Sequence, residues 1–163
     1  MNLSTLILIL TSTSSYDRSD YGQWKGSCYS NTRTSVLLRD GSSIDSSACK
    51  VRSGTWHDPY SDSIFHNPRR VHIDHVLPIR LADEWGGTFW SDSLKQAFYN
   101  DTLNLLAVSY RLTVQKGSSP IWMWMPKPLR GKCEYIRRWR LVKYKYGLNH
   151  NSLEKKIYSE FLS

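Results

Sequence analysis

Near the middle of the chain, the residues from Val71 to Leu77 alternate between apolar and polar side chains and are followed by Pro78. A period of two is typical of a β-strand, whose successive side chains point to opposite faces of a sheet. The proline ends the strand because it has no backbone N–H to donate to a neighbour. A second strand is predicted for the strongly apolar run from Leu103 to Val108. The two predicted strands indicate that the fold contains a small β-sheet.

Helical patterns and a β-hairpin surround these strands. Near the N-terminus, Thr32 can cap a short helix that ends at Asp40 and Gly41. A strand over 49–56, a turn, and a return strand at 64–65 form the expected hairpin. Further helices are predicted over residues 81–85, 92–98, 110–116, 133–146 and 152–161. The sequence therefore predicts an α+β fold.

The chain of 163 residues suits one domain with a tail. Residues 3–10 are almost entirely apolar and resemble the core of a signal peptide, although no basic residue precedes them. A buried N-terminal strand is the alternative, and the run is far too short to span a membrane. Residues 11–30 are rich in Ser, Tyr, Asp and Gly and suggest an exposed leader. We therefore expect a leader over 1–30, a single domain over 31–163, and secretion, with a cytoplasmic location as the alternative.

The charge balance indicates a polyanionic partner. Lys and Arg number 22 against 14 Asp and Glu, which gives a net charge of +8. Nucleic acid is the commonest polyanion for such a surface. Eight basic residues fall between Lys127 and Lys145, where a helix would present a broad positive face. A merely solvated helix exterior is the alternative interpretation.

The pair Asp74 and His75 at the end of the first strand carries the most chemistry. Neighbours on a strand point to opposite faces, but a bend at the strand's end can bring both side chains to one site. A carboxylate binds a divalent cation, and a neutral imidazole beside it can deprotonate water. Phosphodiester hydrolysis needs both functions, so the pair predicts a nuclease-like site.

A second segment supports this interpretation. Asn104 lies 29 residues after His75, at the head of the apolar strand. Its amide can hold a loop by bonding to backbone groups. Thr113 follows on the short helix, just before Lys116 and Gly117, and supplies a third polar side chain. Two strands and a short helix bearing these groups have the order of a ββα-metal arrangement.

The sequence resembles the GmrSD-type, secreted-nuclease branch of the HNH endonucleases from about Thr32 to Leu148. The resemblance implies a ββα-metal core with an added N-terminal helix and β-hairpin and with C-terminal helices. The segments that carry it, in order, are Ser53-Gly54-Thr55-Trp56, Asp58-Pro59-Tyr60, Ile73-Asp74-His75-Val76-Leu77-Pro78, Phe98-Tyr99-Asn100-Asp101, Asn104-Leu105-Leu106-Ala107-Val108, Gln115-Lys116-Gly117 and Cys133-Glu134-Tyr135.

The resemblance also implies roles for single residues. His75 would be the general base, Asp74 a metal ligand, and Asn104 the residue that orients the catalytic loop. Thr113 stands where the family usually has an Asn or His ligand, which is a departure. A Thr hydroxyl is a poorer ligand, although a hard cation such as Mg²⁺ accepts it together with several waters. The implied cofactor is one divalent metal ion, Mg²⁺ first, with Mn²⁺ or Zn²⁺ as alternatives.

The remaining expectations concern contacts and function. Lys116, Arg138 and Lys143 are predicted to contact phosphate, and the resemblance makes a disulfide between Cys49 and Cys133 plausible. An odd count of three cysteines leaves at least one unpaired within the chain. We expect a monomeric endonuclease that acts on DNA with little sequence specificity, and RNA is the second substrate to consider. The alternative is a nucleic-acid-binding protein on a catalytically weakened scaffold, which the Thr113 departure favours.

Overall fold

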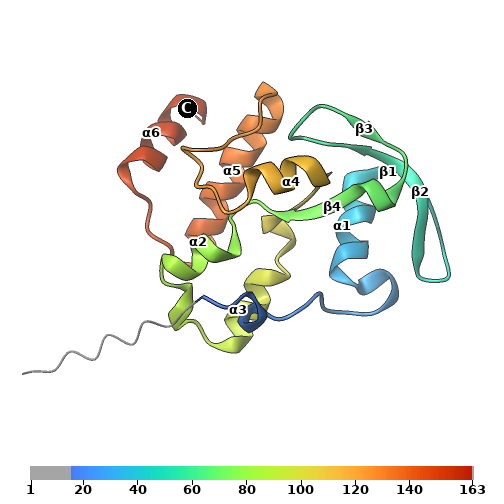
Figure 1. Cartoon of the computed structure of the whole chain (residues 1–163), viewed down its shortest axis with the longest axis horizontal. Coiled ribbons are helices and arrows are strands. Elements are labelled where there is room, and N and C mark those ends of the chain that lie inside the picture. The colour runs from blue at the N-terminus through green and yellow to red at the C-terminus, as the bar shows by residue number, and fades with distance from the viewer. Residues whose placement is uncertain (1–15, 163) are drawn as a thin grey trace, which may run out of the picture.

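A two-stranded antiparallel sheet of β4 (Val71–His75) and β5 (Leu105–Ser109) lies between the two ends of the molecule (Figure 1). The computed structural model describes residues 16–162. Val71 pairs with Ser109 and His75 with Leu105, so the two strands have equal length and no bulge. Both strands were predicted, although β4 ends two residues before Leu77. Helix α4 (Tyr110–Lys116) follows β5 directly, as predicted, and ends at Gly117, where φ is +52°.

Alternate residues of β5 belong to two separate clusters of buried side chains. Leu105 and Ala107 pack with one cluster, whereas Leu106 and Val108 belong to the other. A strand that is covered on both faces must be apolar throughout. This requirement explains why β5 has an almost continuous apolar sequence while β4 does not.

The smaller cluster lies under helix α1 (Thr32–Asp40) and a three-stranded antiparallel sheet. The sheet consists of β1 (Gly41–Ser47), β2 (Lys50–His57) and β3 (Ile64–Phe65), and it occupies one end of the molecule (Figure 1). Trp56 is 1% exposed and anchors β2 to α1 by donating its indole N–H to the carbonyl of Leu37 at 2.9 Å. Strand β1 was not anticipated because its serine-rich sequence has no apolar alternation.

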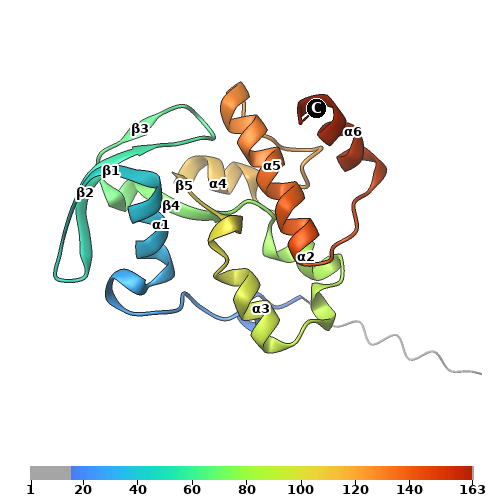
Figure 2. The same ribbon diagram turned by 180° about the vertical axis from the view of Figure 1, so that it is seen from behind.

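The larger cluster fills the other end of the molecule (Figure 2). Four helices enclose it: α2 (Ile79–Glu84), α3 (Asp92–Tyr99), α5 (Leu129–Lys145) and α6 (Ser152–Phe161). Helix α5 begins four residues before the predicted Cys133, because Pro128 can precede a helix without losing a needed N–H. Short 3₁₀ helices cover Arg18–Tyr21, Cys28–Ser30, Pro68–Arg70, Gly87–Phe89 and Thr102–Asn104.

Residues 16–30 are mostly exposed, as composition suggested, but a few anchors pack this segment against the rest of the chain, so it is not a free leader. Tyr21 is fully buried in the larger cluster, and its hydroxyl donates to Asp83 at 2.9 Å. The side chain of Asn100 accepts the backbone N–H of Lys25 at 2.8 Å and so fixes the segment to α3. Burial of the aromatic side chains thus fixes the position of a segment whose other residues are mostly polar. The apolar run over 3–10 lies outside the described residues.

The disulfide predicted between Cys49 and Cys133 is wrong. Cys49 pairs with Cys28, with their Cα atoms 4.3 Å apart, and Cys133 is a free, partly buried thiol on α5. The reason is spatial, since Cys49 lies at the turn between β1 and β2, at one end of the molecule, whereas α5 lies nearer its middle (Figure 1). Within residues 16–162, no helix is both long and apolar enough to cross a membrane.

Candidate active site

A cavity of about 240 Å³ opens where the end of β4 meets the C-terminal part of α4. Asp74 and His75 both line it, although they are neighbours on a strand. The chain leaves the sheet at His75, and this allows both side chains to reach one cavity. Thr113 and Lys116 line the same cavity from α4. The structure therefore brings together four of the residues that the sequence singled out.

Asp74 is a buried carboxylate with two different oxygens. Its Oδ2 accepts the hydroxyl of Tyr60 at 2.8 Å and lies 3.0 Å from the ammonium of Lys116. Lys116 is 1% exposed and also donates to the backbone carbonyl of His75 at 2.8 Å. Among the described residues, Oδ1 of Asp74 has no hydrogen-bond partner. One oxygen is thus compensated, and the other is available to a ligand.

Tyr60 was not predicted as a site residue, although it lies in the Asp58-Pro59-Tyr60 segment of the family resemblance. It is 2% exposed. Burial, with the charge of Asp74 as a further cause, raises the pKa of Tyr60 well above its ordinary value. The hydroxyl therefore remains a proton donor to Asp74. Asp58 holds this turn to the sheet by accepting the backbone N–H groups of Tyr60 at 2.8 Å and Ser109 at 3.2 Å.

His75 is 6% exposed and is held in one tautomer. Its Nε2 lies 2.8 Å from the backbone carbonyl of Tyr99, which can only accept, so Nε2 carries the proton. Nδ1 then bears the lone pair, and it has no hydrogen-bond partner among residues 16–162. Burial lowers the pKa of His75 to about 3, and the charges of Arg18 and Lys116 act in the same direction. The imidazole is therefore neutral near pH 7.

The N-terminal segment forms one wall of the site. The indole of Trp24 stacks on His75 with ring centroids 5.7 Å apart and planes 8° apart. The guanidinium of Arg18 lies 5.6 Å from the centre of the Tyr99 ring, and Arg18 lines the cavity together with Arg80. Sequence reasoning missed Trp24 and Arg18 because it treated this segment as a leader. Its aromatic residues were the only available signal.

Asn104 is fully buried, and its side chain bonds to both backbone groups of Leu77, which belong to two successive peptide units. Its Oδ1 accepts the N–H of Leu77 at 2.8 Å, and its Nδ2 donates to the carbonyl of Leu77 at 3.1 Å. The carbonyl of Asn104 also accepts the N–H of Val76 at 2.8 Å. These three bonds fix the bend that follows His75.

Thr113 is partly buried on α4, and its hydroxyl donates to the carbonyl of Ser109 at 3.2 Å. Its oxygen keeps its lone pairs, and the residue lines the cavity. No group of three His, Cys, Asp or Glu side chains capable of holding a metal occurs within residues 16–162. The available donors are Asp74 Oδ1 and the Thr113 hydroxyl. Two oxygens suit a hard cation that keeps several waters, and they do not suit a soft, fully protein-bound metal.

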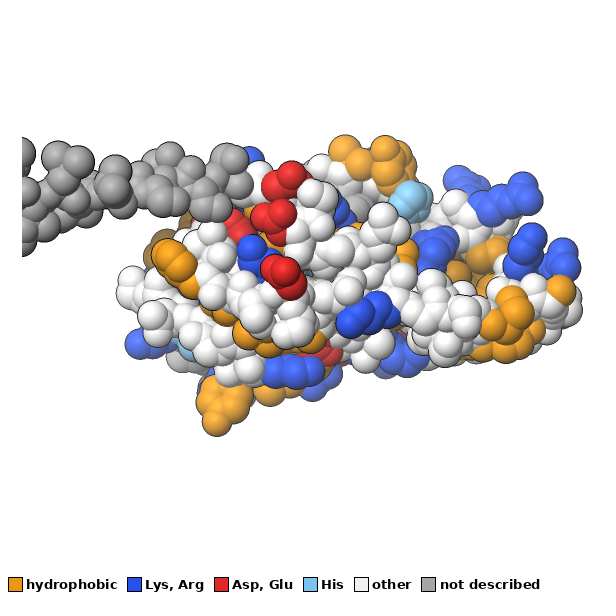
Figure 3. Space-filling view, turned by 90° about the horizontal axis from the view of Figure 1, so that it is seen from below, with side chains coloured by type: hydrophobic (Ala, Val, Ile, Leu, Met, Phe, Trp, Pro, Cys, Tyr) orange, Lys and Arg blue, Asp and Glu red, His pale blue; other side chains and the backbone are white. Residues whose placement is uncertain are grey.

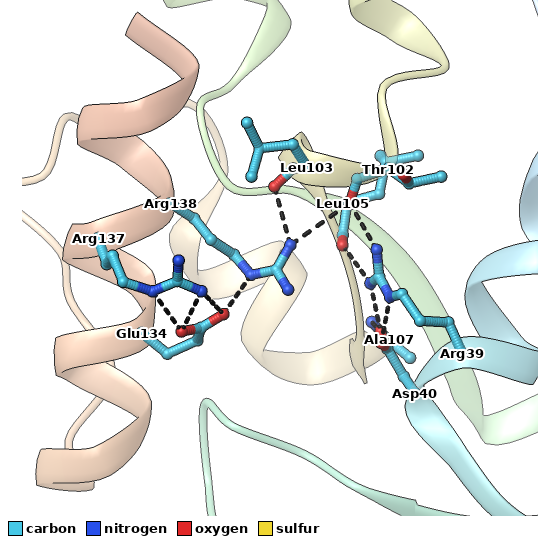
Figure 4. Close-up of polar contacts among 9 residues, drawn as sticks. All are labelled: Arg39, Asp40, Thr102, Leu103, Leu105, Ala107, Glu134, Arg137 and Arg138. Atoms are coloured by element: carbon cyan, nitrogen blue, oxygen red, sulfur yellow. Dashed lines mark hydrogen bonds and ion pairs between the residues drawn. The ribbon is translucent and has the colours of Figure 1, made fainter. Parts of the chain in front are cut away.

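The phosphate contacts predicted for Arg138 and Lys143 are not supported. The guanidinium of Arg138 donates to Glu134 at 2.6 Å and to the carbonyl of Leu103 at 2.9 Å (Figure 4). Lys143 is 1% exposed and pairs with Glu154 at 2.7 Å, so it cannot reach a substrate. Neither residue lines the cavity. Arg138 pairs with a glutamate one turn earlier on α5, and Lys143 pairs with a glutamate on α6.

Figure 4 shows what Arg138 does instead. Arg138 and Arg39 approach the start of β5 from opposite sides, and Arg39 donates to the carbonyl of Leu105 at 2.6 Å. Asp40, which pairs with Arg39, accepts the N–H of Ala107 at 2.9 Å. These side chains satisfy the free edge of β5 and brace the strand that leads to α4.

Comparison with known proteins gives a consistent result. The family model of the GmrSD restriction endonucleases, C-terminal domain, matches residues 29–158. A protein of Arthroderma benhamiae, named as an uncharacterized secreted protein, is 34% identical over 154 residues, which cover 91% of this chain and 74% of the relative. No solved structure matches the chain. The matched range contains Asp74, His75, Asn104 and Thr113, whereas Arg18 and Trp24 precede it.

Proposed function

The chain belongs to the family of GmrSD restriction endonuclease C-terminal domains, and from this premise we propose that it is an endonuclease acting on DNA, with RNA as a second possible substrate. One observation carries the proposal. A neutral His75, with Nδ1 unbonded, shares a cavity with a carboxylate oxygen of Asp74 that has no protein partner. In this proposal β4, β5 and α4 form a ββα-metal core.

His75 would act as the general base by accepting a proton from water at Nδ1. The hydrogen bond from Nε2 to the Tyr99 carbonyl holds the ring in place and stabilises the imidazolium that forms. A pKa near 3 makes the free enzyme's imidazole a weak base. A bound phosphate raises that pKa because a nearby negative charge favours the protonated ring. Substrate binding would thus prepare the base for its task.

The oxygen donors of the cavity fit one divalent cation. Asp74 Oδ1 and the Thr113 hydroxyl would hold it, with water completing the shell, and Mg²⁺ suits this set best. Mn²⁺ or Zn²⁺ are the alternatives. When bound, such an ion supplies positive charge to the phosphate and the leaving oxygen. Lys116, which was predicted to contact phosphate, is 1% exposed and stays paired with the second oxygen of Asp74, so it would act through its charge and not by contact.

Two arginines are suited to hold the scissile phosphate. Arg18 and Arg80 both line the cavity, and we assign them this role in place of Arg138. The Nε of Arg80 pairs with Glu84 at 2.9 Å, which leaves its two terminal nitrogens for phosphate. A guanidinium binds phosphate oxygens with two parallel hydrogen bonds. Asn104 is a positioning residue, because it holds the backbone N–H and carbonyl of Leu77 and through them the bend beside His75. We further propose a monomeric protein that is secreted, since the Arthroderma benhamiae relative is named as secreted.

The second candidate is a nucleic-acid-binding protein without turnover. Thr113 at the ligand position favours it, and so does Lys116, whose ammonium already compensates Asp74. The intact pair of Asp74 and His75 favours the enzyme. Both candidate functions require the protein to bind nucleic acid, so a binding measurement alone does not distinguish between them.

A plasmid-nicking assay with Mg²⁺ or Mn²⁺ separates the two. His75→Ala should lower the nicking rate by at least about 100-fold, because a positioned general base contributes that much. His150→Ala is the matched control, since His150 lies beside Tyr158 near α6 and should leave the rate within about twofold. Equal rates for wild type and His75→Ala would overturn the enzyme hypothesis. Retained DNA binding with no cleavage by wild type would establish the second candidate.

A further inference from the structure

Exposed basic side chains gather at the end of the molecule that holds the three-stranded sheet (Figure 3). They come from β2, from the 3₁₀ helix Pro68–Arg70 and from the start of α4. Among residues 16–162, none of them has a carboxylate within ion-pair distance. We call this set the basic end surface, and its members are Lys50, Arg52, Arg69, Arg70 and Arg111.

The acidic residues of this end do not cancel the charge. Asp58 is fully buried in its turn, and Asp62 pairs with His57 at 2.9 Å. Asp45 lies on β1 opposite Ser53 and forms no ion pair with the described residues. The basic end surface therefore keeps its positive charge.

The basic residues of α5, which the sequence favoured, behave differently. Four of the eight between Lys127 and Lys145 are in ion pairs, one of them fully buried. A paired cation releases fewer counterions when it meets a polyanion than a free one does. The pairs are Arg137 and Arg138 with Glu134, Lys143 with Glu154, and Lys145 with Asp101.

Two hollows cross the basic end surface and meet at Arg69. The larger, of about 690 Å³, is lined by Lys50, Arg52 and Arg69. The smaller, of about 460 Å³, is lined by Arg69, Arg70 and Arg111. Because both hollows are lined by cations and share Arg69, we treat them as one track for an extended anion.

Residues of β4 and α4 connect this track to the candidate active site. On β4, His72 lines the smaller hollow and Asp74 lines the catalytic cavity, about 7 Å further along the strand. On α4, Arg111 and Thr113 face the same two sites in the same order. A chain of phosphates with one member in the cavity would continue onto the basic end surface.

We propose that the basic end surface binds the phosphodiester backbone of the nucleic acid on one side of the scissile bond. This inference rests on the proposed function for the identity of the polyanion. Its contacts are cations without base-reading geometry, so binding is independent of sequence and sensitive to salt. Helix α5 contributes little to this binding.

The test measures binding of a fluorescein-labelled 20-base-pair DNA duplex by anisotropy, with EDTA present to prevent cleavage. The triple variant Arg52→Glu, Arg69→Glu, Arg111→Glu should bind at least tenfold more weakly at about 0.15 M salt. Its slope of log K against log salt should fall by about 2 to 3, since three phosphate contacts are lost. Lys127→Glu, Lys155→Glu, Lys156→Glu is the matched control, with the same change of charge on exposed residues. It should weaken binding by less than about threefold.

Equal losses in the two triple variants would overturn the inference, because binding would then follow net charge alone. If the Arg52, Arg69, Arg111 triple variant lost binding to phosphatidylserine vesicles but bound DNA like wild type, the inference would also be overturned, in favour of a membrane partner. If the triple variant fails to fold by circular dichroism, Arg69→Gln, Arg111→Gln replaces it, with a smaller loss of the same sign. DNA binding through this surface without any cleavage would contradict the proposed hydrolysis only. Cleavage with an unchanged KM in the triple variant would contradict the surface only.

Discussion

The ammonium of Lys116 lies 3.0 Å from Oδ2 of Asp74, and the two side chains are 1% and 7% exposed. Removing one member of such a buried pair leaves the other charge without compensation. The pair therefore stabilises the fold at the same carboxylate that we propose as a metal ligand. The ammonium at Oδ2 and a cation at Oδ1 would use different oxygens, but they compete for the negative charge of one carboxylate.

Replacing Lys116 by Met should expose this competition. Lys116→Met should lower the free energy of unfolding by about 3–5 kcal/mol, because Asp74 remains buried with no opposite charge beside it and keeps only the hydrogen bond from Tyr60. Added Mg²⁺ should raise the melting temperature of the variant more than that of wild type, since no ammonium then neutralises the carboxylate. Urea denaturation measures the loss of stability. Thermal melts with 0 to about 10 mM Mg²⁺, a range suited to a weak site, measure the response to the cation.

Asp74→Asn combined with Lys116→Met is the control. The double variant has no buried charge at the pair, so it should recover part of the stability and lose the Mg²⁺ response. A Mg²⁺-induced shift that persists without the carboxylate would show that the cation binds elsewhere.

Asn104→Ala should affect both stability and activity. The change leaves the N–H and carbonyl of Leu77 unpaired in a buried position, which costs about 1–3 kcal/mol. The bend beside His75 loses its fixed geometry, so the nicking rate should fall through kcat more than through KM. Denaturation and steady-state kinetics on plasmid DNA check the two parts.

The stability-matched control for this change is Val142→Ala, since Val142 is fully buried on α5 and away from the cavity. It should cost about 1–3 kcal/mol with little change in kcat. A similar loss of kcat in both variants would mean that Asn104 acts through stability alone.

Local patterns predicted the parts of the fold that depend on neighbours in sequence. The helix Tyr110–Lys116 was predicted with its correct limits, because a strand precedes it and Gly117 ends it. The buried strand β5 was evident from its composition. The α+β class and the family followed from the same segments.

The errors concern contacts between distant segments. Tyr21 and Trp24 sit in a polar segment, and only the folded chain shows that one enters the core and the other covers His75. The pairing of Cys28 with Cys49 depends on where the β1–β2 turn lies. Lys143 had a suitable sequence position for a surface cation, but Glu154 from another helix captures it. Contacts of this kind cannot be predicted from the local periodicity of the sequence.

The stability of the protein should depend on pH through His75. The pKa of this group is about 3 in the folded protein and about 6.5 when unfolded. The unfolded chain therefore binds more protons between these values, so acidification favours unfolding. The contribution of His75 is fully present above about pH 6.5 and is lost at up to ~1.4 kcal/mol per pH unit as the pH falls toward 3.

Urea denaturation at a series of pH values measures this dependence. His75→Gln removes the titrating group, so the difference between wild type and variant isolates the His75 contribution from that of other groups. The difference should be flat above about pH 6.5 and should decline below it. A pH-independent difference would mean that the imidazole has an ordinary pKa in the folded protein.

Trp24→Ala should raise the pKa of His75. Burial is the main cause of the depressed value, and the indole of Trp24 covers one face of the imidazole. Removing it admits water and stabilises the charged ring, so the pKa should move toward about 6.5. An NMR titration of the His75 ring protons measures this directly. Trp24→Phe, which keeps an aromatic cover, should shift the pKa less, and an unchanged pKa in Trp24→Ala would show that other groups provide the burial.

Thr113→Asn tests whether the α4 ligand limits the reaction. An amide oxygen is a stronger neutral ligand than a hydroxyl, and an extra ~1.4 kcal/mol of metal binding corresponds to a tenfold gain in affinity. The Mg²⁺ concentration for half-maximal nicking should fall about tenfold. Thr and Asn have similar helix propensities, so α4 should persist even though the bond to the Ser109 carbonyl is lost.

Thr113→Val completes this test, because it keeps the shape of the side chain and removes the oxygen. It should raise the Mg²⁺ requirement or abolish nicking, in the direction opposite to Thr113→Asn. If both variants match wild type, Thr113 is not a ligand, and Asp74 Oδ1 alone must hold the cation through water. Only a gain in one variant and a loss in the other places the metal between β4 and α4, because a merely structural effect at Thr113 would disturb both variants in the same direction.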